Sequence, residues 1–243
     1  MTYHRIHVLS DGFRSPNARA LLYPLLIHRN ALDECGYKVN IFSKASGNFG
    51  ECDLLIVDSK YFHGPERGQL CFVLKSLERF NSITNNVAWY DTTDSAGWLL
   101  GDVLPVVNTY FKNQLLRDKS RYLKPMYGRR VYADYYYRTK GVKDERPVAS
   151  PQVKEEQLLN RLRLGWNSGL ADYSRFGPCR MELYRMTRLP HLLTQHRHVT
   201  LHDTSRPIPI SCRMGVNYER NSIAYQRRAL RSLLKGRLLS GKL

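Results

Sequence analysis

Two short polar segments contain most of the side chains that could do chemistry. They span residues 10–15 and 91–95, and each comes directly after an apolar run. The second places two carboxylates and three hydroxyls in five consecutive residues. Carboxylates can act as general bases, bind metal ions or accept hydrogen bonds from substrate hydroxyls. We therefore predict Asp91 and Asp94 as candidate catalytic bases, and Thr92 as a residue that binds substrate.

The first segment combines a glycine with the start of a helix. Gly12 permits a close approach to the backbone, and Ser15 followed by Pro16 is typical of an N-cap with proline at the first helical position. The free N–H groups of a helix N-terminus can bind an anion or a sugar hydroxyl. We predict four substrate-binding residues here: Asp11, Gly12, Arg14 and Ser15.

The same residue types also occur in turns without any catalytic role. Asp94 or Ser95 could cap a following helix, and Asp91 could accept backbone N–H bonds within a turn. We expect Asp11, Asp91 and Asp94 to line one cleft if the segments form a site. The sequence has no G-x-G-x-x-G motif after its first strand, so the fingerprint of a dinucleotide site is absent.

Alternating strands and helices must position both segments. The expected strands are residues 5–10, 38–43, 53–58 and 86–90, and the expected helices are 17–35, 68–80, 152–164 and 221–234. Pro24 predicts a kink or a late start in the first helix, and Gly36 predicts its end. A further strand is expected at 207–213. This alternation predicts an α/β fold with a Rossmann-like, doubly wound parallel sheet, followed by a helical, basic C-terminal portion.

The formal net charge of +17 is unevenly distributed along the chain. Residues 1–111 have a net charge of −1, whereas residues 112–243 carry 28 basic and 10 acidic side chains. Such asymmetry predicts an anionic partner: nucleic acid, an acidic membrane surface or a phosphorylated substrate. The alternative is that a basic surface only keeps the chain in solution. The five cysteines are scattered without a close pair, which is typical of reduced thiols in a cytoplasmic protein.

Several longer segments resemble a known group of enzymes. They are WYDTTDS at 89–95, VLPVVNTYFKNQLLRDKSRY at 103–122, YGRRVYADYYYRTKGVKDERP at 127–147 and SCRMGVNYERNSIAYQRRAL at 211–230. The first three resemble the acceptor-side domain of microbial glycosyltransferases of the two-domain GT-B type. The last resembles the start of their donor-side domain. The motifs are weak singly and moderately specific as a set.

The resemblance implies a hexosyltransferase that moves a sugar from a nucleotide-sugar donor to a glycan or lipid-linked acceptor. It implies an acceptor-side domain at 1–193 and the beginning of an incomplete donor-side domain at 194–243. Arg213 is then the candidate contact to the donor phosphates, because a fixed cation neutralises the departing diphosphate. Enzymes of this type usually need no bound metal, so no cofactor is expected. The composition and the scattered cysteines predict a cytoplasmic location, and the basic charge of the second half leaves a peripheral contact to an anionic membrane as an option.

A second class of function is a basic nucleic-acid-binding module without catalysis. Tyrosines interleaved with arginines between residues 127 and 140 could stack on bases or pack against sugar rings, but we favour packing within the fold for most of them, because three consecutive tyrosines cannot all face one groove. The sequence contains no known nucleic-acid-binding motif, which disfavours this alternative. Four histidines between residues 191 and 202 lack the spacing of a zinc site, so we interpret them as unligated.

Overall fold

The computed structural model describes residues 3–13, 15–65, 68–93, 95–145, 152–166, 178–187, 189, 192 and 218–239. The chain divides into two compact units. Unit 1 comprises Met1–Lys124 and Pro151–Thr194, and unit 2 comprises Pro125–Ser150 and Gln195–Leu243. The functional domain boundary expected between residues 193 and 194 stays a prediction.

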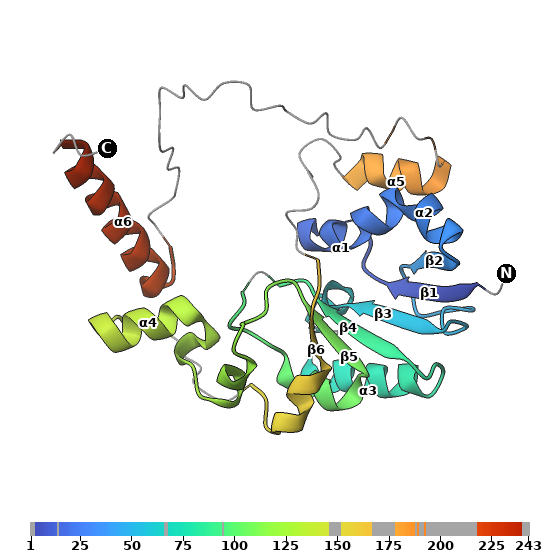
Figure 1. The fold of residues 1–243 in the computed structure, drawn as a ribbon, viewed down its shortest axis with the longest axis horizontal. Helices are drawn as coiled ribbons and strands as arrows, with labels where there is room; N and C mark the ends of the chain where they lie inside the picture. Colours follow the sequence, from blue (N-terminus) through green and yellow to red (C-terminus); the bar gives the residue numbers. More distant parts are fainter. Residues whose placement is uncertain are drawn as a thin grey trace. The chain divides into compact units, whose positions relative to one another are not determined.

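Unit 1 is built on a six-stranded sheet in which every neighbouring pair is parallel. Its strands are β1 (His4–Leu9), β2 (Tyr37–Phe42), β3 (Leu54–Asp58), β4 (Val87–Asp91), β5 (Thr109–Lys112) and β6 (Leu162–Leu164), in the order β2-β1-β3-β4-β5-β6 (Figure 1). The four strands expected from the sequence are confirmed, as is the Rossmann-like parallel sheet. Strands β5 and β6 were not predicted.

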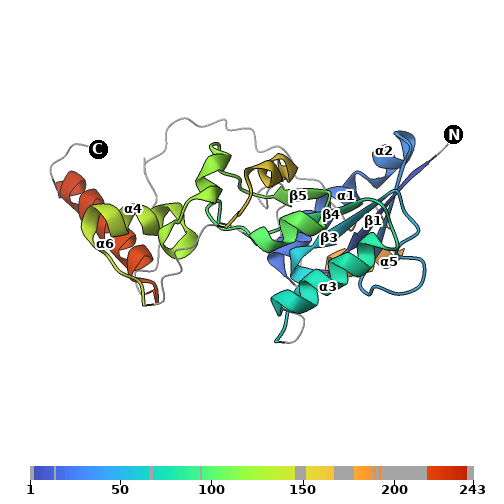
Figure 2. The ribbon, with the colours of Figure 1, turned by 90° about the horizontal axis from the view of Figure 1, so that it is seen from below.

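Helices pack on the sheet through side chains that alternate along the strands. Val57 and Trp89 belong to one core, together with apolar residues of α3 (Leu70–Asn81). Ile56 and Tyr90 belong to a second core, together with residues of α1 (Pro16–Ile27) and α5 (Pro178–Thr187). Successive side chains of a strand point to opposite faces, so these two cores lie on opposite sides of the sheet. Figure 2 shows α3 lying along its face.

The first helix begins at Pro16, as the N-cap signal predicts, and ends one turn after Pro24. The amide of His28 donates to the carbonyl of Pro24 at 3.0 Å, and a separate helix, α2 (Arg29–Glu34), follows. Gly36 then ends this helical region with φ at +84°, in the left-handed region that glycine adopts without strain. The prediction of a late helix start is therefore wrong, and the helical region is interrupted at His28.

The prediction of a helix at residues 152–164 is wrong. The chain there forms a 3₁₀ helix, η5 (Glu156–Arg161), and then strand β6, which pairs with β5. The guanidinium of Arg161 donates to the carbonyls of Leu104, Pro105 and Val107. Pairing with β5 and the hydrogen bonds of Arg161 to unit 1 carbonyls therefore override the local helical pattern. The other 3₁₀ helices of the described chain are η1 (Ser59–Phe62), η2 (Gly101–Val106), η3 (Lys119–Leu123) and η4 (Tyr127–Arg129).

Unit 2 contains α4 (Val131–Lys140) and α6 (Asn221–Leu239). Asp144 accepts hydrogen bonds from the backbone amide and the hydroxyl of Ser222, both at 2.8 Å, and so caps the N-terminus of α6. Tyr127 and Tyr137 stack with ring centroids 4.0 Å apart. The helix expected at residues 221–234 is confirmed by α6, which extends to Leu239. The strand expected at 207–213 lies outside the described residues.

Candidate functional site

The polar segments of the sequence follow the carboxyl ends of adjacent strands. Ser10 follows β1, Asp58 ends β3, Asp91 ends β4 and Lys112 ends β5. The register places Asp58 beside Tyr90 and Asp91 beside Lys112. The chain runs from β1 to β2 on one side of β1 and then crosses to β3 on the other side. This reversal of direction makes a topological switch point between β1 and β3. Ligands of open α/β sheets bind at such points.

A buried hydroxyl network surrounds Asp58 at this switch point. Ser10 donates to one carboxylate oxygen of Asp58 at 2.7 Å, and the backbone amide of Lys60 donates to the other at 2.9 Å. The hydroxyl of Thr92 lies 3.4 Å from Asp58 and 3.2 Å from the hydroxyl of Ser59. Asp58, Ser10 and Thr92 are fully buried, whereas Ser59 is partly exposed. Ser59 is therefore the member of the network that solvent can reach.

Burial changes the protonation of Asp58. Removal of the carboxylate from water raises its pKa from 3.8 to about 6, although the hydrogen bonds from Lys60 and Ser10 oppose this shift. A carboxyl group with this pKa changes its protonation state close to neutral pH. Asp58 was not selected from the sequence. Its position at the end of a buried strand is the same signal that selected Asp91.

Asp91 lies in a second buried network. One of its oxygens accepts from the amide and hydroxyl of Thr93, at 2.9 and 2.6 Å. The other accepts from the hydroxyl of Tyr110 at 2.7 Å and lies 3.3 Å from the ammonium of Lys112. The ammonium also donates to the hydroxyl of Thr93 at 2.7 Å. Asp91 and Lys112 together hold Thr93, whose side chain is partly exposed.

Burial also affects the tyrosine of this network. The pKa of Tyr110 is well above its usual value because the phenol is buried and because the negative charge of Asp91 is adjacent. Tyr110 therefore remains a hydrogen-bond donor to Asp91 throughout the physiological pH range. Tyr110 and Lys112 were not identified from the sequence, because β5 was not predicted.

The first polar segment joins the second through the start of α1. Ser15 accepts from the amides of Asn17 and Ala18 at 3.2 and 3.4 Å, which confirms the predicted N-cap. The amide of the Asn17 side chain donates to the carbonyl of Thr92 at 2.7 Å. A side-chain hydrogen bond therefore links the two segments that contain Ser15 and Thr92 at the carboxyl edge of the sheet.

The structure places the remaining predicted site residues as follows. Asp11 and Gly12 lie in the loop after β1, where both are partly exposed and Gly12 has φ at +76°. Arg14, Asp94 and Arg213 lie outside the described residues. The convergence of three aspartates therefore stays a prediction, as do the roles of Asp91 and Asp94 as bases. A base role for Asp91 requires access to a carboxylate that is 1% exposed.

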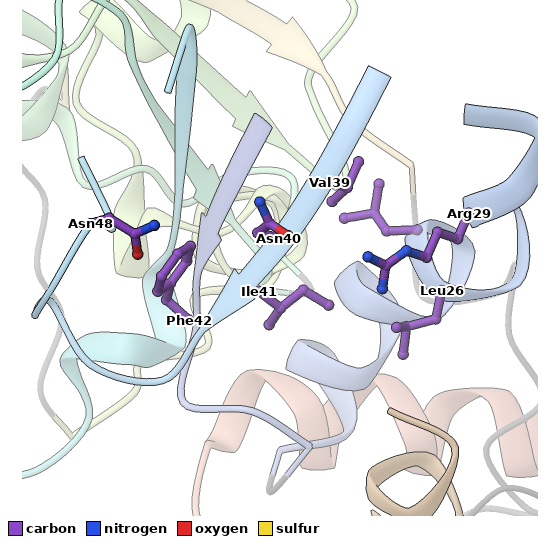
Figure 3. Close-up of a pocket in the computed structure, with 8 residues that line it drawn as sticks. Leu26, Arg29, Val39, Asn40, Ile41, Phe42 and Asn48 are labelled. Carbon is purple, nitrogen blue, oxygen red and sulfur yellow. The ribbon is translucent and has the colours of Figure 1, made fainter. Parts of the chain in front are cut away.

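A separate hollow of about 320 Å³ lies along the outer edge of the sheet (Figure 3). Leu26 and Arg29 line it from the helical side, and residues 39–42 of β2 line the other side. The side chain of Asn40 also lies 3.3 Å from the buried ring of His7. This hollow contains none of the residues that the sequence singled out.

The described part contains no group of three or more His, Cys, Asp or Glu side chains that could hold a metal ion. None of its helices is both long enough and apolar enough to cross a membrane. The chain matches no protein-family model, no curated protein and no solved structure.

Proposed function

We propose that this chain belongs to a glycosyltransferase and that unit 1 binds the acceptor. The observation that supports this most directly is the set of hydroxyls held by buried carboxylates at the carboxyl edge of the sheet, beginning at the β1/β3 switch point. Sugars are recognised mainly through hydrogen bonds to their hydroxyls, and partly exposed, oriented hydroxyls of the protein are suitable partners. The resemblance to GT-B enzymes points to the same activity.

Different residues have different roles in this proposal. Asp58 is a positioning residue, because it holds Ser59 through Thr92. Asp91 holds Thr93 directly. Ser59 and Thr93 are the groups that contact the acceptor. In the loop after β1, Asp11, Gly12 and Ser15 bind the same ligand, together with Arg14.

The proposed reaction is a substitution at the anomeric carbon of the donor sugar. An acceptor hydroxyl attacks that carbon, and the bond from the carbon to the donor phosphate breaks with its electron pair retained by the nucleoside diphosphate. A carboxylate removes the proton of the acceptor hydroxyl, and Asp91 and Asp94 are the candidates. Arg213 is the candidate cation for the departing diphosphate.

The test is carried out on the full chain with a panel of nucleotide sugars and simple glycosides. Saccharide binding is followed by saturation-transfer NMR, and transfer is followed by mass spectrometry of the acceptor. Ser59→Ala and Thr93→Val should each weaken saccharide binding about tenfold, because each removes a hydrogen bond to the ligand. Ser46→Ala changes an exposed hydroxyl outside the network and is the matched control.

Two results would contradict the proposal. One is the absence of both saccharide binding and sugar transfer across the panel. The other is saccharide binding that the Ser59 and Thr93 variants leave unchanged, because the ligand would then bind elsewhere. Loss of binding in Ser46→Ala would point to a general effect on folding.

A further inference from the structure

Strand β5 has an asparagine at each end, and the two side chains differ in their hydrogen bonds. Asn108 precedes the strand, and its side-chain oxygen accepts from the backbone amide of Val87 at 2.9 Å. Asn113 follows the strand at the carboxyl edge of the sheet and is only 5% exposed. Its side-chain oxygen, Oδ1, is the only buried side-chain oxygen of the described residues that has no hydrogen-bond partner. The same residue type is therefore satisfied at one end of β5 and unsatisfied at the other.

Another buried amide shows how unit 1 satisfies such groups. Gln152 is 6% exposed, and both ends of its side-chain amide are bonded. Its oxygen accepts from the backbone amide of Leu99, and its nitrogen donates to the carbonyl of Gly97, both at 2.5 Å. A buried acceptor without a donor costs free energy, so native proteins nearly always provide a partner from the chain, from water or from a ligand. Oδ1 of Asn113 therefore requires a donor other than the described residues.

Asn113 lies beside Thr92 of the buried hydroxyl network. Its backbone amide donates to the carbonyl of Asp91 at 3.3 Å, which continues the pairing of β4 and β5 by one residue. Phe111 and Tyr90 stack, with ring centroids 5.7 Å apart, on the side of the sheet that α1 covers. Because side chains alternate along a strand, Asn113 and Thr92, each two residues further along, lie on that same side. Asn113 therefore borders the proposed saccharide site.

A buried donor on this side of the sheet also lacks a partner. The indole N–H of Trp166, two residues after β6, makes no hydrogen bond with the described part of the chain. Its ring lies 4.9 Å from that of Tyr90, measured between centroids, and so belongs to the same side. A hydroxyl group can both donate and accept, whereas an ammonium ion only donates and a carboxylate only accepts. An unpaired acceptor and an unpaired donor together suit the hydroxyls of a sugar.

We propose that Asn113 is a specificity-determining residue, whose side-chain oxygen accepts a hydrogen bond from one hydroxyl of the bound saccharide. This inference rests on the function proposed above. A sugar hydroxyl that donates to Oδ1 supplies the missing partner. A deoxy analogue that lacks this hydroxyl leaves the oxygen buried and unpaired, so it binds more weakly. Asn113 thereby selects sugars that have a hydroxyl at one particular position.

The first measurement concerns the fold without ligand. Asn113→Leu replaces the amide with an apolar side chain of similar shape. Its melting temperature should equal or exceed that of the wild type, because an unpaired buried oxygen is removed and no hydrogen bond of that oxygen is lost. The matched control is Asn108→Leu, which removes the acceptor of the Val87 amide and should lower the melting temperature by about 3–6 °C. A loss in Asn113→Leu as large as that in the control would show that the amide stabilises the fold and would overturn the proposal.

The second measurement concerns binding. The probes are methyl glucoside, methyl galactoside and methyl mannoside, each with monodeoxy analogues that lack one hydroxyl, and binding is followed by saturation-transfer NMR. For a glycoside that binds, one analogue should bind the wild type about tenfold more weakly than the parent glycoside. Asn113→Leu should bind the parent about tenfold more weakly than the wild type does, and should bind that analogue and the parent equally, because both changes remove the same contact. Asn108→Leu should discriminate as the wild type does.

The outcomes separate this inference from the function on which it rests. If the wild type binds a glycoside and Asn113→Leu discriminates among the analogues as the wild type does, Asn113 does not contact the ligand, and only this inference is overturned. If the wild type binds none of these glycosides, the inference is again overturned. The proposed function is overturned with it if sugar transfer is also absent.

Discussion

The ammonium of Lys112 lies 3.3 Å from a carboxylate oxygen of Asp91, and neither side chain is more than 1% exposed. The two residues end neighbouring parallel strands and stand opposite each other in the register. Their pairing is what allows two charges to remain in the interior of unit 1. Removal of one partner leaves the other charge buried without compensation, which is far more costly than loss of a pair at the surface.

Lys112→Met should therefore lower the free energy of unfolding by about 3–5 kcal/mol. Urea denaturation followed by fluorescence measures the change. The matched control is Lys154→Met, which breaks the pair of Lys154 with Asp102, where the lysine side chain is 84% exposed. That variant should lose less than about 1 kcal/mol. Comparable losses in the two variants would contradict the structural role of the buried pair.

Asp58 should make stability depend on pH. Its pKa in the folded state, about 6, exceeds the ordinary value of 3.8. Between these values the folded chain retains a proton that the unfolded chain has lost, so stability falls as the pH rises. The Asp58→Asn variant has no titrating group at residue 58. Relative to this variant, the free energy of unfolding of the wild type should fall by about 2–3 kcal/mol between about pH 4 and pH 7.

Urea denaturation of both proteins across this pH range tests the effect. The control is Asp102→Asn, which changes a carboxylate that is 46% exposed. Its unfolding free energy should depend on pH in nearly the same way as that of the wild type. A constant difference in unfolding free energy between wild type and Asp58→Asn would show that Asp58 has the same pKa in both states.

The N-cap of α1 offers a test of a local interaction. Ser15→Ala removes the acceptor for the amides of Asn17 and Ala18 and should lower the free energy of unfolding by about 1 kcal/mol. Ser15→Asp retains an acceptor at the same place and should restore most of this loss. Thermal denaturation of the three proteins is the measurement, and equal stability of the Ala and Asp variants would be contrary to a capping role.

Gly101 lies against the backbone of Gln152. A methyl group at residue 101 would collide with the carbonyl of Gln152, which cannot move independently of the chain. Gly101→Ala should therefore lower the free energy of unfolding by about 3 kcal/mol. The matched control is Gly50→Ala, where the obstacle is the side chain of Ile83, which is 45% exposed and can rotate away. The control should lower the free energy of unfolding by less than about 1 kcal/mol. Chemical denaturation in which Gly50→Ala was less stable than Gly101→Ala would contradict this packing.

Features that depend on near neighbours in the sequence were predictable. Strands β1 to β4 are apolar runs bounded by polar turns, and Ser15 with Pro16 marks the start of α1 through a local hydrogen bond. Gly36 ends α2 because its positive φ suits glycine. The positions of the two polar segments at the carboxyl ends of strands follow from the same periodicity, and the sequence alone determined them.

The sequence did not predict features that depend on pairing between distant residues. Strand β6 is only three residues long, and its segment has a helical pattern that pairing with β5 overrides. The networks of Asp58 and Asp91 join residues 34 and 19 positions apart, respectively, through Thr92 and Tyr110. Periodicity identifies which residues are buried, but only the tertiary structure decides which buried polar groups meet. A carboxylate in the interior needs partners from other strands, and the order of the strands supplies them.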